Sequence, residues 1–248
     1  MTRTITAFDT ETTGLNTQTD HIVELGLIKF DTETWEILGE KKWYIKPACD
    51  FEMTAGAQEI TGLTKEFILE NGVLMTSIWE EALAFIGADD ILSYNGNYFD
   101  VPMLYNNLNR NGLSFDFENR MFYDALVIER KRNSLKLGDV YKRYTGKEMQ
   151  DAHDALADVR GLIEVFKHQT KNMDGIEDPS FKLLSPEGFV KVNDLGHLVF
   201  ATGKYKGKTT NEICREDTNY IKWVFEKFSP STRNAIRNEW YKENPKQQ

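Results

Sequence analysis

Two carboxylates that follow a short apolar run near the start of the chain constrain its fold most tightly. Residues 5–8 (Ile-Thr-Ala-Phe) lead directly into Asp9 and Glu11, which one residue separates. Side chains alternate between the faces of a strand, so both carboxylates point to the same side. Paired carboxylates repel each other and lose hydration in a closed site, and bound Mg²⁺ or Mn²⁺ would offset both costs. A surface strand with two solvated acids has the same spacing, so acids elsewhere must decide.

The length and composition are those of a globular protein with room for two domains. The chain has 248 residues, of which 40% are hydrophobic and 28% charged, enough for one α/β domain and a smaller second one. The two cysteines, Cys49 and Cys214, are far apart, which disfavours a disulfide framework or a zinc cluster. With no apolar run of membrane-spanning length and no secretory signal, we expect a cytoplasmic protein.

The net charge of −9 is unevenly distributed along the chain. Residues 186–248 hold 11 Lys and Arg against 8 Asp and Glu, a balance of +3, which leaves −12 for the remainder. An acidic body with a mildly basic end is unlike a protein that passively coats DNA. It fits an enzyme whose acids gather metal ions and whose tail helps to hold a polyanion.

Hydrophobic periodicity predicts alternating strands and helices. Strands are expected at residues 3–8, 21–30, 35–45, 91–94 and 198–200. Helices are expected at residues 78–86, 101–111, 135–144, about 151–171 and around 220–225, with a loop and a short helix at 58–64. Ser77 is expected to cap the helix at 78–86, with Glu80 in the capping-box position.

Two further acids lie where helices are expected to begin. Asp100 follows the segment from Asn95 to Phe99, and taken alone it would be interpreted as an N-cap. Asp158 lies five residues after His153, which is about 140° around an ideal helix. Both can therefore face one site only if His153 lies in or before the first turn. A histidine there would titrate near neutrality.

These three motifs occur together in a characteristic order. The acid-x-acid pair is followed by Asn95 with Phe99-Asp100, and then by His153, Ala155 and Asp158. In this the chain resembles the DnaQ-like, or DEDDh, 3′-to-5′ exonucleases, such as the epsilon subunit of DNA polymerase III, over about residues 3–170. The resemblance implies an α/β fold with a ribonuclease H-like mixed sheet flanked by helices. It also implies hydrolysis of phosphodiester bonds at DNA 3′ ends, with release of nucleoside 5′-monophosphates.

The resemblance further implies a site for two divalent metal ions, Mg²⁺ or Mn²⁺. Asp9 would bridge both ions, Glu11 and Asp158 would complete the one on the nucleophile side, and Asp100 would support the leaving-group side. His153 would act as the general base toward the attacking water. Substrate contacts are expected from residues beside these motifs, with the side chain after the Gly14 turn as a wedge against the terminal base: Thr12, Gly14, Leu15, Asn95 and Phe99.

The chain is expected to form an exonuclease domain at residues 1–172, a linker at 173–185 and a small α+β module at 186–248. The module resembles the C-terminal module of exodeoxyribonuclease X relatives in Phe200, the turn at 203–208 and Tyr220-Ile221-x-Trp223, although two residues separate Phe200 from Gly203. Three lysines of the turn are expected to contact backbone phosphates, with Tyr205 stacking on a base: Lys204, Lys206 and Lys208. The alternative is a stabilising appendage with a basic turn.

Two other functions stay open. An RNA-trimming exonuclease of the RNase T or oligoribonuclease kind would use the same core, because the metals contact phosphate whatever the sugar. A non-catalytic adaptor for nucleic acid or a polymerase is the second, although all four acids and the histidine are present. The expected partners are single-stranded or frayed DNA 3′ ends in repair or proofreading, with RNA and a DNA polymerase as further candidates and no membrane.

Overall fold

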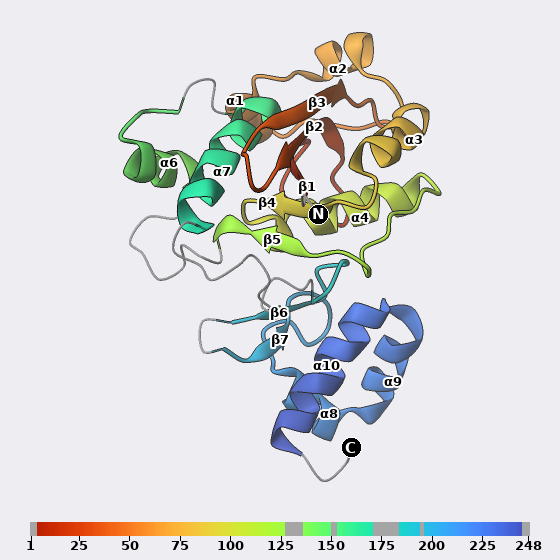
Figure 1. The fold of residues 1–248 in the computed structure, drawn as a ribbon. Helices are drawn as coiled ribbons and strands as arrows, with labels where there is room; N and C mark the ends of the chain where they lie inside the picture. Colours follow the sequence, from red (N-terminus) through yellow and green to blue (C-terminus); the bar gives the residue numbers. More distant parts are fainter. Residues whose placement is uncertain (1–3, 127–135, 150–152, 171–183, 194–195, 245–248) are drawn as a thin grey trace. The chain divides into compact units, whose positions relative to one another are not determined.

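The computed structural model describes residues 4–126, 136–149, 153–170, 184–193 and 196–244 (Figure 1). The chain divides into two compact units. The first comprises Met1–Asp116 and Arg120–Lys182, and the second comprises Phe117–Asn119 and Leu183–Gln248. Most of the linker expected at 173–185 lies outside the described residues, and the expected domain boundaries stay a prediction.

The first unit is built on a five-stranded mixed sheet with the strand order β3-β2-β1-β4-β5. The strands are β1 (Thr4–Thr12), β2 (Ile22–Asp31), β3 (Ile37–Tyr44), β4 (Asp90–Ser93) and β5 (Phe122–Asp124). β1, β2 and β3 form an antiparallel meander, whereas β4 is parallel to β1 and β5 is parallel to β4. This mixed sheet with flanking helices is the fold class that the sequence predicts.

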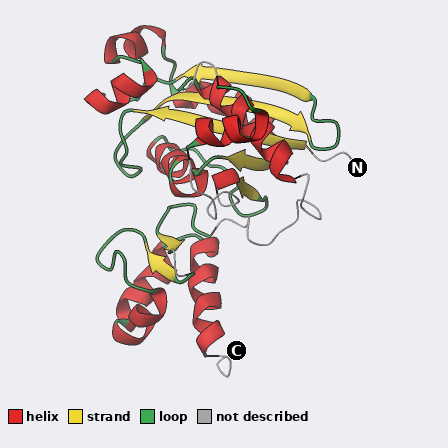
Figure 2. Ribbon diagram, turned by 90° about the vertical axis from the view of Figure 1, so that its left-hand side faces the viewer, coloured by secondary structure: helices red, strands yellow, loops and turns green. Residues whose placement is uncertain are grey.

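Helices cover both faces of this sheet (Figures 1 and 2). They are α1 (Ala55–Thr61), α2 (Lys65–Asn71), α3 (Met75–Ile86), a 3₁₀ turn (Gly96–Tyr98), α4 (Asp100–Arg110), α6 (Leu137–Thr145) and α7 (Ala155–Thr170). α7 packs on β1 and β2 over a core that includes Ala7, Ile28 and Phe166. Phe8 and Leu25 point to the other face, where they meet side chains of α3 and α4.

This alternation fixes where the two carboxylates of β1 lie. Ile5 and Ala7 belong to the core beneath α7, so Asp9 and Glu11, two and four residues beyond Ala7, share the face that α7 covers. The strand is longer than the expected 3–8, because it continues to Thr12. Both acids therefore lie within β1 and are held by its ladder to β2.

The start of α3 differs from the prediction. α3 begins at Met75, its N-cap is Leu74 with no side-chain hydrogen bond, and the Ser77 hydroxyl donates to the Leu74 carbonyl oxygen over 2.7 Å. The helix starts a turn earlier than its apolar pattern suggested, so Ser77 lies inside the first turn and cannot cap it. Gly87 ends the helix as expected, in the left-handed region at φ 60°.

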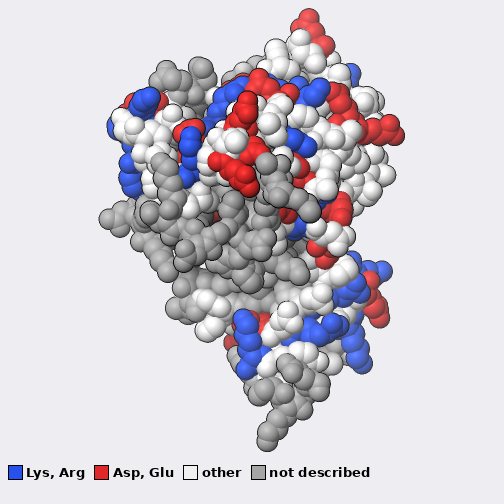
Figure 3. All heavy atoms as spheres, viewed as in Figure 1, with Lys and Arg blue, Asp and Glu red and all other residues white. Residues whose placement is uncertain are grey.

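The second unit is a small α+β structure. It contains β6 (Val190–Val192) antiparallel to β7 (Leu198–Phe200), followed by α8 (Thr210–Glu216), α9 (Thr218–Lys227) and α10 (Pro230–Glu243). Phe200, Ile213, Val224 and Ile236 lie in its core. In the view of Figure 3, Lys and Arg side chains gather on this unit. Among the described residues of the whole chain, no helix is long and apolar enough to cross a bilayer.

Candidate active site

Two neighbouring strands, β1 and β2, contribute carboxylates to the candidate site. In the β1–β2 register, Asp9 lies opposite Gly26 and Glu11 lies opposite Glu24. Glu11 is 8% exposed and Glu24 is 3% exposed, so Glu24 is a further buried carboxylate next to the predicted pair. Its position within an apolar strand was the signal that the sequence analysis missed.

The start of α7 brings Asp158 to these acids, because α7 lies unusually close to β2. A Cβ at Gly26 would lie only 2.9 Å from the Ala155 Cβ, so the absence of a side chain on β2 permits the approach. The Ala155 amide donates to Glu24 Oε1 over 3.0 Å. Among the described residues, the buried Asp158 Oδ1 has no hydrogen-bond partner, which leaves a lone pair for a ligand.

His153 lies just before α7, the placement that a shared site requires. Its φ of 73° is in the left-handed region, and its amide donates to Asp158 Oδ2 over 3.2 Å. Possible ligand atoms of Glu11, His153 and Asp158 lie within 4.8 Å of one another. The histidine is exposed, so its imidazole can exchange protons with solvent.

Asp100 approaches from the opposite side of β1. It is the first residue of α4 and is 4% exposed, and its Oδ1 accepts a hydrogen bond of 2.6 Å from the Thr10 hydroxyl. The N-cap of α4 is Phe99 instead, so the carboxylate is free of the capping role that it would have had as an isolated acid. Repulsion between Asp9 and Asp100 contributes to the raised pKa of Asp9, which places the two carboxylates in one electrostatic cluster.

The loop before α4 is fixed by a buried acid that the sequence analysis did not assign to the site. Asp124, at the end of β5, accepts hydrogen bonds from the amides of Asn95 (2.8 Å) and Asn97 (3.3 Å). Asn95 is exposed, with φ 61°. A Cβ at Gly96 would lie 2.1 Å from the Ser93 Oγ, so this position requires glycine. Asp124 thus shapes the loop that carries Asn95 and leads to Asp100.

The turn after β1 projects an apolar side chain into solvent. The Thr12 hydroxyl donates to the Gly14 carbonyl oxygen over 2.8 Å, and a Cβ at Gly14 would lie 2.5 Å from the Asp20 Oδ2. Leu15, which follows, is 83% exposed. Phe99 is half-buried at the other predicted contact point. The remaining predicted contacts belong to the second unit: Lys204, Lys206 and Lys208.

Crowding and burial make this cluster unfavourable when all its members are ionised. Burial raises the pKa of Asp9 well above its usual range, and Asp100 and Glu11 add to the rise. Burial followed by repulsion from Glu24 raises the pKa of Glu11 to about 8. Burial raises the pKa of Asp100 to about 6 even though Thr10 donates to it, and burial likewise raises that of Asp158. Bound cations would lower all of these pKa values.

The donor set fits divalent metal ions. Carboxylate oxygens dominate it, as Mg²⁺ and Mn²⁺ prefer, and Asp158 Oδ1 is buried without a partner among the described residues. Asp9, Glu11, Asp100 and Asp158 remain the residues predicted to hold such ions, and Glu11 and Asp158 offer ligand atoms within 4.8 Å of each other.

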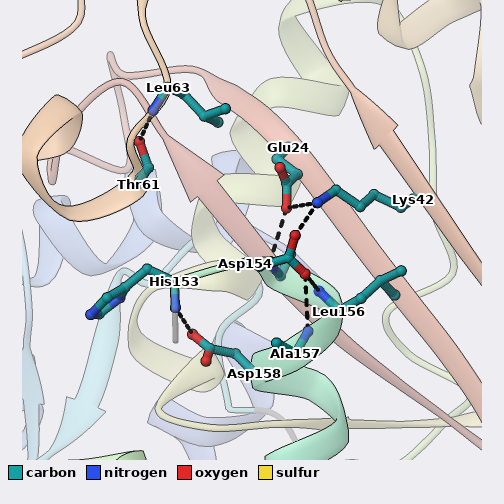
Figure 4. A network of polar contacts seen from close by, with 10 residues as sticks. Glu24, Lys42, Thr61, Leu63, His153, Asp154, Leu156, Ala157 and Asp158 are labelled. Atoms are coloured by element: carbon teal, nitrogen blue, oxygen red, sulfur yellow. Dashed lines mark hydrogen bonds and ion pairs between the residues drawn. The ribbon is translucent and has the colours of Figure 1, made fainter. Parts of the chain in front are cut away.

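A cationic clamp secures the start of α7 next to His153 (Figure 4). Lys42, on β3, forms ion pairs with Glu24 Oε1 at 3.1 Å and with Asp154. The Asp154 carboxylate also accepts the amides of Leu156 and Ala157, both at 3.1 Å, and so caps α7. The clamp, defined as Glu24, Lys42 and Asp154, thus joins β2, β3 and the residue after His153.

A ribonuclease H-like sheet that carries a cluster of carboxylates and a histidine defines a class of nucleases that bind metal ions. A family profile described as "Exonuclease" matches residues 6–166, more than half of the chain. The chain therefore belongs to this exonuclease family, which confirms the predicted resemblance. A second profile, "Exodeoxyribonuclease X-like C-terminal", matches residues 203–229.

Similar proteins agree with this assignment. DNA polymerase III PolC-type from Thermotoga petrophila is 32% identical over 166 residues, which are 66% of this chain and 12% of the relative. E. coli Exonuclease I in complex with a dT13 oligonucleotide has a TM-score of 0.60 and 26% identity, over 68% of this chain and 41% of that one. A zinc-bound E. coli Exonuclease I complex with single-stranded DNA has a TM-score of 0.60 and 25% identity, over 70% and 41%. The chain thus spans less than half the length of these proteins.

The crowding of the acids predicts that one neutral substitution stabilises the metal-free protein. Glu11 has a pKa of about 8 in the folded protein against an ordinary 4.5, so its ionisation destabilises the fold increasingly as pH rises through this window. In EDTA at pH 9, Glu11→Gln should raise the free energy of unfolding by about 2 kcal/mol, and the gain should shrink at pH 6. Urea unfolding at both pH values measures it. The exposed Glu33→Gln serves as the control, and no gain at pH 9 would contradict the prediction.

The clamp predicts a defect in turnover when its cation is removed. Lys42→Met leaves Glu24 buried without its counter-ion and loosens Asp154 at the start of α7, so kcat should fall about tenfold while KM changes little. Lys42→Arg should retain most of the activity. The matched control is Lys41→Met, because the neighbouring Lys41 pairs with Glu81 at the surface, where both side chains are about half exposed. Equal effects of the two methionine substitutions would refute a positioning role for Lys42.

Proposed function

We propose that this chain is a metal-dependent 3′-to-5′ exonuclease that shortens DNA and releases nucleoside 5′-monophosphates. The observation that carries the proposal is the convergence of Asp9, Glu11 and Asp158 with an exposed His153 on one face of the sheet. Membership of the exonuclease family supports it. The E. coli Exonuclease I structures bound to single-stranded DNA support a DNA strand as substrate.

The residues divide the chemistry among them. Two divalent ions, Mg²⁺ or Mn²⁺, would supply charge neutralisation of the phosphodiester and activation of water. Asp9 would contribute to both ions, Glu11 and Asp158 would complete one of them, and Asp100 would support the other. The Thr10 hydroxyl orients the Asp100 carboxylate.

His153 is proposed as the general base. Its imidazole accepts a proton from the attacking water at a ring nitrogen and passes it to solvent, to which it is exposed. The backbone of His153 is held by the hydrogen bond from its amide to Asp158 and by the Lys42 clamp next to it. The side chain can therefore move while its Cα stays at a fixed position relative to the carboxylates.

The terminal nucleotide is proposed to lie between the two loops that flank the acids. Thr12 and Gly14 shape one loop, and Asn95 and Phe99 belong to the other. Leu15 presents an apolar side chain to a terminal base, so an unpaired 3′ end is favoured.

The second unit has its own core and is not a flexible tether, which favours a stand-alone repair enzyme over a polymerase-bound proofreading subunit.

The first experiment tests which end of a strand is shortened and whether DNA or RNA is the substrate. Single-stranded DNA and RNA, labelled at the 3′ or the 5′ end, are incubated with the protein and Mg²⁺ or Mn²⁺, beside Asp9→Ala. We expect stepwise shortening of DNA from the 3′ end and no activity in the variant. Preferential shortening of RNA would support the RNA-trimming function, and inactivity on both would favour a non-catalytic adaptor.

The exposed position of Leu15 predicts that the enzyme prefers substrates with frayed 3′ ends. On a duplex whose terminal pair is mismatched, Leu15→Ala should lose about threefold to tenfold of the preference over a matched terminus, because the apolar wedge is gone. Leu69→Ala is the control, since Leu69 is another exposed leucine but lies on α2. The ratio of initial rates on the two duplexes measures the effect. A ratio equal to that of the wild type would show that Leu15 does not contact the terminal base.

A further inference from the structure

The second unit presents a row of aromatic rings at its surface. The ring centroids of Tyr205 and Tyr220 are 4.8 Å apart, and those of Tyr220 and Trp223 are 5.3 Å apart. Trp223 is 42% exposed and is the one exposed aromatic side chain among the residues that the structure describes, whereas the two tyrosines are half-buried. These three residues are called the aromatic strip.

Buried rings hold the strip in place from beneath. Trp223 meets Phe189 and Phe228 at centroid distances of 6.4 and 5.5 Å, and Tyr220 meets Phe200 at 5.7 Å. Since these partners belong to or pack against the core of the unit, the strip is ordered before any ligand binds. Binding to it therefore has a low entropic cost.

Asp217 fixes the other end of the strip. Its Oδ2 accepts the Tyr205 hydroxyl over 2.7 Å, and Oδ1 accepts the Tyr220 amide over 3.0 Å at the start of α9. Gly203 contributes by leaving space, because a Cβ there would lie 3.2 Å from the Tyr220 hydroxyl oxygen. The turn and α9 are thus connected through one carboxylate that orients two rings.

The cations beside the strip are only partly available to phosphates. Lys204 Nζ lies 3.2 Å from Asp217 and 4.6 Å from the Tyr205 ring centroid, and Lys208 pairs with Glu216 at 3.2 Å. Lys206 is exposed and forms no ion pair with the part of the chain that the structure describes. If all three lysines contacted phosphates, two of these ion pairs would have to break. Contact with the aromatic rings is therefore expected to contribute more to binding at this surface than contact with the lysines.

We propose that the aromatic strip is a binding platform for single-stranded nucleic acid, on which bases of the strand stack at Trp223 and Tyr220 while Lys206 contacts a backbone phosphate. The proposal rests on the exonuclease function, for which such a strand is the substrate. Ring faces bind any base, and the balance of +3 over residues 186–248 complements a polyanion.

Affinity of the full-length chain for a strand measures the platform directly. Fluorescence anisotropy with an end-labelled oligothymidylate of about 20 nucleotides, in EDTA to prevent cleavage, should show about tenfold weaker binding for Trp223→Ala. Trp223→Phe should keep most of the affinity, because a ring face remains. Lys206→Ala should weaken binding about threefold and lower the slope of log K against log salt by about 0.7. The exposed Lys242→Ala on the same unit is the control.

Three results would overturn the proposal. Unchanged affinity in Trp223→Ala would show that the strip does not bind the strand and would favour a protein partner for it. Equal losses in the alanine and phenylalanine variants would indicate a structural role for Trp223. A larger loss in Lys206→Ala than in Trp223→Ala would show that the contact is mainly electrostatic. Thermal unfolding of each variant identifies any that fail to fold.

Cleavage of a dinucleotide separates this proposal from the proposed function. A dinucleotide offers at most two bases, which the proposed catalytic site itself engages, so Trp223→Ala should cleave it at the wild-type rate and raise KM only for the long strand. His153→Ala should lose both activities. If the wild type cleaves neither substrate, the exonuclease function fails, and the anisotropy measurement still decides whether the strip binds a strand.

Discussion

The candidate site depends on one contact, the close approach of the first turn of α7 to β2. The Ala155 amide reaches the Glu24 carboxylate over 3.0 Å, and the absence of a side chain at Gly26 permits the approach. Asp158 and His153 follow from this contact, because both are fixed relative to the start of the helix. If α7 were displaced outward, the acids of β1 would remain in the strand but would lose the partners that turn them into a site.

The same contact brings together carboxylates that repel one another, and Lys42 supplies a positive charge beside them. Lys42 pairs with Glu24 and Asp154, which lie at the edge of the carboxylate cluster, and these two ion pairs leave the central acids to exogenous ions. A buried ion pair is weak evidence for stability. Its value here is geometric, since it sets the position of the residue that follows His153.

Sequence reasoning predicted the members of the site better than the means by which they are held. The one-residue spacing of Asp9 and Glu11 fixes their shared face, and the five-residue spacing of His153 and Asp158 requires a histidine in or before the first turn. The structure has His153 before the helix, which begins at Ala155 and not near residue 151. Glu24, Lys42 and Asp124 escaped notice because the partners that join them to the site lie 18 or more residues away, across strands whose register no local pattern reveals. The roles of the individual acids stay predictions.

The backbone of His153 has a consequence for how this position can vary. A residue with a side chain in the left-handed region, here at φ 73°, is disfavoured by about 1 kcal/mol, and glycine would relieve this strain. Glycine lacks the imidazole, however, so the substitution that best suits the local conformation removes the group that we propose as the general base. Position 153 is therefore one at which selection for a more stable protein and selection for a working enzyme act in opposite directions.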